Sequence, residues 1–172
     1  MLSDQEQLYL ERYTKELNVH FGDDQRRIQH AHKVLDYVLQ IIAGEKLEGE
    51  ICSILIVTAL LHDVGIKAAE EKYHSSAGKY QEIEGPPVIR EMLGRWDEPQ
   101  AFIERVAYIV GGHHTSAKND GLDFQIIWEA DLLVNVEEEG LDQDTEKLQA
   151  IITKNFRTSS GLRIANQRYS LG

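Results

Sequence analysis

The chain has 172 residues, a length typical of one domain with a single hydrophobic core. Its 29 acidic and 18 basic residues give a formal net charge of −11. A surface this negative disfavours binding to a nucleic-acid polymer or to an anionic membrane, because both carry negative charge themselves. A small phosphorylated partner remains compatible with it, since a bound metal ion can reverse the potential inside a pocket.

The cellular setting is indicated by three features. The single cysteine, Cys52, cannot form an internal disulfide and lies in an apolar run, so we expect a small buried side chain. Residues 1–11 are polar and lack the pattern of a signal peptide. The longest nearly continuous apolar stretch, Ile51–Leu61, is too short to span a bilayer. Together they predict a cytoplasmic protein without a membrane partner.

The N-terminal part predicts three consecutive helices. Ser3 and Glu6 form a possible capping box for the first. The second covers residues 24–43, is capped by its first residue, and repeats apolar positions with a helical period. Residues 48–61 are apolar nearly all round, and a buried strand fits this pattern too. Their length and the helices on either side favour a core helix, closed by Gly65.

The remainder also predicts helices, after a less regular stretch over residues 67–84. Two prolines introduce a short helix over 85–93, since proline is tolerated in a first turn. Further helices follow over 97–112 and 124–138, and two closing helices over 142–170. The predicted N-caps of the last three helices are Asp123, Asp144 and Thr158. No alternating strand of useful length occurs, so the predicted fold is all-α.

His30 is the first candidate site residue. It lies one turn from Val34 on the inward side of its helix, whereas His32 shares its face with polar residues and points toward solvent. A core histidine is commonly a hydrogen-bonded packing residue, so His30 alone does not indicate a metal ligand.

His62 and Asp63 directly follow the apolar run that ends in Leu60 and Leu61. If both are buried they need partners, because an unpaired carboxylate in the interior is costly, and a divalent cation satisfies both groups. The alternative is a histidine at a helix C-terminus beside an aspartate that bonds to a loop.

Two further polar elements occur later in the chain. His113 and His114 follow Gly111-Gly112, where glycine lets the backbone turn sharply or approach closely. They fit two ligands, one ligand with a proton-transferring neighbour, or an exposed polar helix end. Asp131 lies in a helix that is apolar almost everywhere, so it needs a partner if buried. Glu129 has the same claim, and periodicity does not choose between them.

Taken in chain order, these elements resemble the H…HD…D pattern of the HD superfamily of metal-dependent phosphohydrolases. The segment 27–34 resembles the first-histidine helix of that family, and 58–65 (TALLHDVG) resembles its central signature. The segment 129–133 (EADLL) resembles its final-aspartate helix, which favours Asp131 as the ligand. The likeness covers about residues 24–138. It implies that residues 1–172 form a single HD-type domain.

The resemblance implies a helical bundle that holds one or two divalent metal ions. The ligands of one metal would be His30, His62, Asp63 and Asp131. In members with two metals the HD aspartate bridges, and two further ligands precede the final aspartate. His113 fits the second of these positions, and Glu84 stands in for a histidine at the first. Since glutamate suits hard cations, iron, manganese or magnesium is favoured over zinc, cobalt or nickel.

Two departures argue against the cyclic-dinucleotide phosphodiesterase branch of the family. Residues 115–122 lack its Gly-Tyr-Pro element, and Ile66 occupies the place of its lysine, with Lys67 one position later. The resemblance implies hydrolysis of a phosphate ester, and the acidic exterior argues for a small nucleotide or sugar phosphate as the substrate over a polymer. His114 and Lys67 are the catalytic candidates, and Arg90 is the candidate for substrate binding. For Lys67 and Arg90 the alternative is a solvated side chain at the surface.

Two other functions stay open. Some HD proteins hold a di-iron pair and use dioxygen to cleave carbon bonds, which needs both metals and hence the Glu84 position. The other alternative is a non-catalytic metal-binding sensor or partner-binding module. The complete ligand set speaks against it, because a degenerate domain has no reason to retain every ligand.

Overall fold

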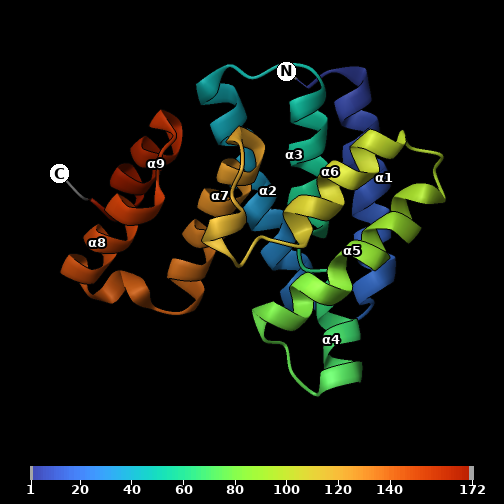
Figure 1. The fold of residues 1–172 in the computed structure, drawn as a ribbon. Helices are drawn as coiled ribbons and strands as arrows, with labels where there is room; N and C mark the ends of the chain where they lie inside the picture. Colours follow the sequence, from blue (N-terminus) through green and yellow to red (C-terminus); the bar gives the residue numbers. More distant parts are fainter. Residues whose placement is uncertain (1, 171–172) are drawn as a thin grey trace.

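The computed structural model describes residues 2–170, and over this range the chain is helical and contains no strand. The predicted all-α fold is therefore confirmed. Figure 1 shows the arrangement of the helices. The α-helices are α1 (Asp4–Phe21), α2 (Gln25–Glu45), α3 (Glu50–Leu61), α4 (Gly65–Tyr73), α5 (Gly78–Gly94), α6 (Gln100–Val110), α7 (Leu122–Glu138), α8 (Thr145–Asn155) and α9 (Ser159–Tyr169), and two short 3₁₀ turns are η1 (Ser116–Lys118) and η2 (Leu141–Gln143).

Helix α3 is the core of the fold. Every residue from Cys52 to Leu61 is buried, as expected for a helix that is apolar on all faces. Helices α1, α2, α6 and α7 pack around it (Figure 1). The run Glu50–Tyr73, which joins α3 to α4, is long and apolar enough to cross a membrane by length and composition, but 78% of its most apolar window is buried inside the protein.

Most of the predicted helix starts are confirmed by capping contacts. Ser3 and Glu6 form the reciprocal capping box of α1. The side-chain oxygens that accept a backbone N–H in the first turn of α2, α8 and α9 belong to Asp24, Asp144 and Thr158. The prediction for Asp123 was wrong: α7 begins at Leu122, and Asp123 lies in its first turn. Its carboxylate instead accepts two hydrogen bonds from Arg105.

The predicted irregular stretch over residues 67–84 was also wrong, because α4 and the first part of α5 occupy it. The glycines that suggested helix ends serve a close helix crossing. A Cβ on Gly65 would lie 3.0 Å from the Cα of Gly85, so the backbones of α4 and α5 meet where side chains would not fit. Helix α5 also continues through Pro86 and Pro87, which lie inside it and not in its first turn.

The two predicted C-terminal helices are present as α8 and α9, packed beside α7 (Figure 1). The fully buried carboxylate of Glu129 on α7 anchors them. It accepts hydrogen bonds from the backbone N–H groups of Arg157 and Thr158, from the Thr158 hydroxyl and from Gln125. Glu129 is thus buried and paired for a structural reason, at the N-terminus of α9.

Candidate metal centre

Side chains from α2, from α7 and from the turn that follows α3 meet at the C-terminal end of α3. The Nε2 atom of His30 on α2 lies 3.1 Å from Oδ1 of Asp131 on α7 and 3.7 Å from Oδ2 of Asp63. The Nε2 atom of His62 lies 3.5 Å from Oδ2 of Asp63 and 3.6 Å from Oδ1 of Asp131. The structure therefore brings His30 together with residues that follow it by 32 positions (His62) to 101 positions (Asp131) in the sequence.

A second group of potential ligands shares Asp63 with the first. The Nε2 atom of His113 lies 3.4 Å from Oδ1 of Asp63, the carboxylate oxygen that does not face His30. One ring nitrogen of His114 joins them, and the ligand atoms of these three residues lie within 4.8 Å of one another. Asp63 thus lies between two adjacent positions, each bordered by histidine nitrogens.

The outer nitrogens of three histidines are held in place. His62 and His113 each direct Nδ1 to the backbone carbonyl three residues earlier, at 2.9 and 2.8 Å. Nδ1 of His30 lies 3.1 Å from Oε2 of Glu138. Because a carbonyl or carboxylate oxygen only accepts, each Nδ1 carries a proton, so each Nε2 is the nitrogen that faces the cluster and can give its lone pair to a metal ion once it is deprotonated.

This arrangement fits a divalent cation. The Nε2 atoms of His30 and His62 are 3.3 Å apart, and two lone pairs at this distance repel each other unless a proton or cation lies beside them. The Nε2 atom of His113 is buried and has no hydrogen-bond partner among residues 2–170. Imidazole nitrogens with carboxylate oxygens are a common donor set for iron, manganese and zinc.

The electrostatics of the cluster are those of a cation site. Burial lowers the pKa of His62, but the Asp63 and Asp131 carboxylates outweigh burial and raise this pKa to about 9. Burial raises the pKa of both aspartates, and the neighbouring histidines more than reverse the effect, so both remain ionised well below their usual range. The ionised carboxylates favour a positive charge at the Nε2 atoms, whether proton or metal.

His114 lies at the edge of the cluster. Burial, and then the neighbouring His113, lower its pKa to about 4. Its Nε2 atom lies 3.2 Å from Oε1 of Gln81 on α5, a residue that sequence reasoning missed because it fell within the supposedly irregular stretch. Glu138, which contacts His30, was missed as well. It follows Asp131 by seven residues, two helical turns, and this spacing on one face was a usable signal.

The structure does not bring Glu84 to the cluster. Both of its oxygens lie 2.9 Å from Nζ of Lys72, and the Tyr73 hydroxyl donates to Oε1 at 3.0 Å. Its carboxylate is therefore neutralised by a side chain of α4. The role of Glu84 as a ligand stays a prediction that this geometry does not favour, and the argument from Glu84 against zinc loses its basis.

The two cationic candidates have other partners. Nζ of the exposed Lys67 donates to the backbone oxygen of His20, at the end of α1. The guanidinium of Arg90 forms two hydrogen bonds with Glu104, which joins α5 to α6 at the surface. Neither contact involves the clustered histidines, so the roles of Lys67 and Arg90 remain predictions.

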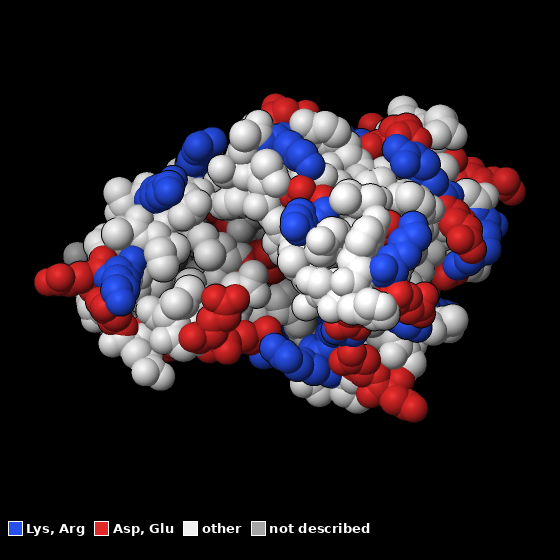
Figure 2. Space-filling view, turned by 60° about the horizontal axis from the view of Figure 1, so that its bottom comes forward, with Lys and Arg blue, Asp and Glu red and all other residues white. Residues whose placement is uncertain are grey.

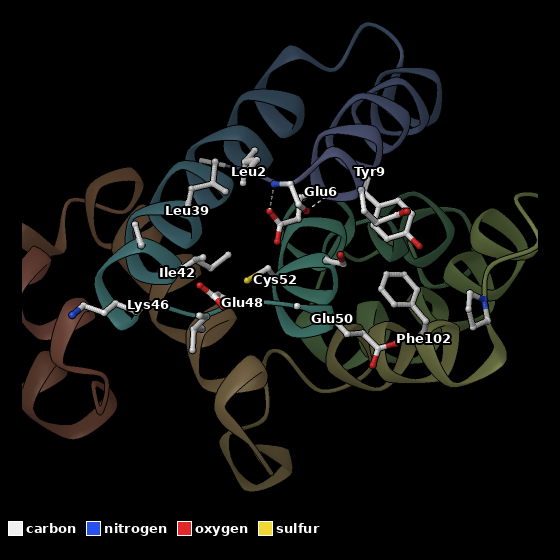
Figure 3. Close-up of a pocket in the computed structure, with 17 residues that line it drawn as sticks. Leu2, Glu6, Tyr9, Leu39, Ile42, Lys46, Glu48, Glu50, Cys52 and Phe102 are labelled. Carbon is white, nitrogen blue, oxygen red and sulfur yellow. Dashed lines mark hydrogen bonds between the residues drawn. The ribbon is translucent and has the colours of Figure 1, made fainter.

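Two hollows differ in their lining. Figure 2 shows the molecule with the lower side of Figure 1 turned forward, and this face has a hollow with acidic atoms at its floor. A separate cavity of about 880 Å³ lies at the N-terminal end of α3, lined largely by apolar side chains such as Leu39, Ile42 and Phe102 (Figure 3). None of the clustered histidines or aspartates lines it.

Comparison with solved structures identifies the fold. No protein-family model matches the chain, and no curated protein matches its sequence. A crystal structure described as a predicted HD superfamily hydrolase, from an uncultured Thermotogales bacterium, aligns over 95% of this chain and 86% of its own, with a TM-score of 0.69 and 20% identity. The chain therefore has the same fold as that structure. Its clustered histidines and aspartates form groups that could hold a metal ion.

Proposed function

We propose that this HD-fold protein is a metal-dependent hydrolase that cleaves a phosphate ester of a small molecule. The supporting observation is the convergence of histidine Nε2 atoms and two ionised carboxylates at the end of α3. The residues that would hold one divalent cation are His30, His62, Asp63 and Asp131. Asp63 and His113 border a second position, with which His114 is also associated.

A bound divalent cation supplies two things to such a reaction: it lowers the pKa of a coordinated water and offsets negative charge on phosphoryl oxygens. The protein's own groups do the rest. The Nδ1 contacts fix three imidazole rings, so the donors need no rearrangement on binding. Asp63 and Asp131 balance the cation's charge. His114 lies close enough to move a proton while remaining more exposed than His113.

The substrate class follows from charge and access. A formal net charge of −11 repels a polyanionic polymer over its whole length, whereas a nucleotide or sugar phosphate presents only its phosphate to the site. The ionised Asp63 and Asp131 carboxylates repel a phosphate unless a cation is bound beside them. The proposal therefore makes substrate binding dependent on metal.

The decisive experiment is metal analysis of protein purified without chelator or added metal, followed by a phosphatase and nucleotidase panel with that metal restored. We expect about one or two ions per chain and cleavage of at least one small phosphate ester. Iron with oxygen consumption on a small polyol or phosphonate would indicate the oxygenase instead. Metal retention without cleavage across the panel would indicate a sensor.

Two matched pairs of variants test the assignment of ligands. H30Q and D131N remove clustered donors, whereas H32Q and D36N make the same chemical changes on α2 outside the cluster. We expect the first pair to lose bound metal and activity, and the second to retain both. Equal metal content in H30Q and H32Q would reject the proposed site.

A further inference from the structure

Gln81 on α5 connects the backbone of one loop to the side chain of His114. Gln81 is buried, with 7% of its surface exposed. Nε2 of Gln81 donates to the Ser76 carbonyl at 2.7 Å, and Oε1 lies 3.2 Å from Nε2 of His114. The amide therefore links the loop before α5 to His114, the residue that follows His113.

The chemistry of these partners fixes the orientation of the amide. The Ser76 carbonyl can only accept a hydrogen bond, so the amide nitrogen has to face it. A flipped amide would place two oxygens 2.7 Å apart and leave both without a proton. The amide oxygen consequently faces His114, and because this oxygen only accepts, Nε2 of His114 has to carry a proton.

We propose that Gln81 is a positioning residue that holds His114 as its Nε2–H tautomer, and so presents Nδ1 as the nitrogen available to a proton or a cation. This is the reverse of His30, His62 and His113, whose Nδ1 atoms are occupied and whose Nε2 atoms are free. The tautomer itself does not depend on the proposed function, but its role in catalysis does. There, the contact with Gln81 fixes which nitrogen of His114 carries the proton and which is left open.

The surroundings of His114 hold its ring against rotation. A Cβ on Gly78 would lie 2.7 Å from Cγ of His114, so the ring packs directly on the α5 backbone. The His113 ring lies on another side, with the two ring centroids 3.9 Å apart. The backbone N–H of His114 also donates to Oε1 of Glu82 at 3.0 Å. Ring and backbone are thus both fixed to α5, and the Gln81 amide determines which nitrogen is protonated.

Long-range ¹H–¹⁵N correlation spectra of metal-free, ¹⁵N-histidine-labelled protein test the inference, with His114 assigned through H114Q. We expect a proton on Nε2 of His114 that exchanges slowly with water, and protons on Nδ1 of the other three. Q81M keeps the length and burial of the side chain but accepts no such hydrogen bond, so the slow Nε2–H signal should vanish.

The control is Q100M, the same substitution on the exposed face of α6, which should leave the His114 signal unchanged. A proton on Nδ1 of His114 in the wild type, or an unaltered slow signal in Q81M, would overturn the inference. The readout needs neither metal nor substrate. A protein that hydrolyses no phosphate ester but shows this tautomer rejects the proposed function alone, whereas an active protein with Nδ1–H at His114 rejects this inference alone.

If hydrolysis is observed, Q81M should lower kcat by roughly 10- to 100-fold with little change in KM, as for other residues that orient a ligand or catalytic histidine. Circular dichroism should show an unchanged helical content, since Met fills the volume of Gln. An equal loss in Q100M would mean that the effect is not specific to the His114 contact.

Discussion

The Nε2 atoms of His30 and His62 face each other at 3.3 Å, although their residues belong to different helices. Each ring is held from behind at Nδ1, His30 by a carboxylate and His62 by a backbone carbonyl, so neither ring can turn away without losing a hydrogen bond. A positive charge between or beside them is needed to make this approach favourable. The approach of the two rings therefore favours a proton or a metal cation at the Nε2 atoms.

Saturating divalent metal should accordingly stabilise the folded chain. At about 100 times the Kd the linkage contributes about 2.7 kcal/mol to the free energy of unfolding. For a protein of this size that corresponds to a rise of roughly 5 to 10 °C in the thermal midpoint, measurable by calorimetry. We expect the rise in the wild type and in H32Q and its absence in H30Q. A similar rise in H30Q would place the stabilising metal elsewhere.

Much of the site could be predicted from the sequence, for an identifiable reason. The helical period placed His30 on the buried face of α2 and His32 on the wetter face, and burial in the structure agrees. Asp131 lies in an almost wholly apolar helix and is indeed buried. Periodicity could not separate it from Glu129, because both are buried. Their contacts in the structure separate them: Asp131 lies beside His30 and His62, whereas Glu129 accepts hydrogen bonds from the start of α9.

The α4–α5 region could not be predicted, and its glycines explain the failure. Gly65 suggested the end of a helix and Gly85 the start of another, but each lies where a Cβ would meet another part of the chain. Such tertiary contacts leave no periodic signal in the sequence. The error concealed Gln81, whereas Glu84 was chosen because it stands where the resemblance expects a histidine.

Gly65→Ala tests the helix crossing. The new Cβ would lie 2.5 Å from the carbonyl oxygen of Gln81 and 2.7 Å from the backbone nitrogen of Gly85, and backbone atoms cannot yield as a flexible side chain does. We expect a loss of about 3 kcal/mol in the free energy of unfolding, measured with urea. In Gly94→Ala, where the described structure has no atom near the new Cβ, stability should stay within about 0.5 kcal/mol or rise. Equal effects would refute the close crossing.

Glu129→Leu tests the anchor of the C-terminal helices. It leaves the backbone N–H groups of Arg157 and of the buried Thr158 without their carboxylate acceptor. We expect a loss of about 2 to 4 kcal/mol, and faster amide hydrogen exchange in α9 than in α3. The control is Glu139→Leu, at an exposed position just after α7. Metal binding should survive in both variants, because Glu129 contacts no cluster residue, and its loss in Glu129→Leu would link the anchor to the site.

The Tyr9–Glu98 contact predicts how stability responds to alkaline pH. The Tyr9 hydroxyl donates to Oε2 of Glu98 at 2.5 Å, and burial together with this carboxylate raises the pKa of Tyr9 from 10.0 to about 12. The unfolded chain therefore loses the Tyr9 proton before the folded chain does. The stabilisation is complete below pH 10 and is lost as the pH rises from 10 through 12.

Urea unfolding at several pH values should show that the free energy of unfolding of the wild type exceeds that of Y9F by less and less across this window. Tyr13 also contacts Glu98, but it is present in both proteins and cancels in the difference. The exposed Tyr108, replaced by Phe, provides the control, and a wild-type advantage over Y9F that stays constant up to pH 11.5 would contradict the raised pKa.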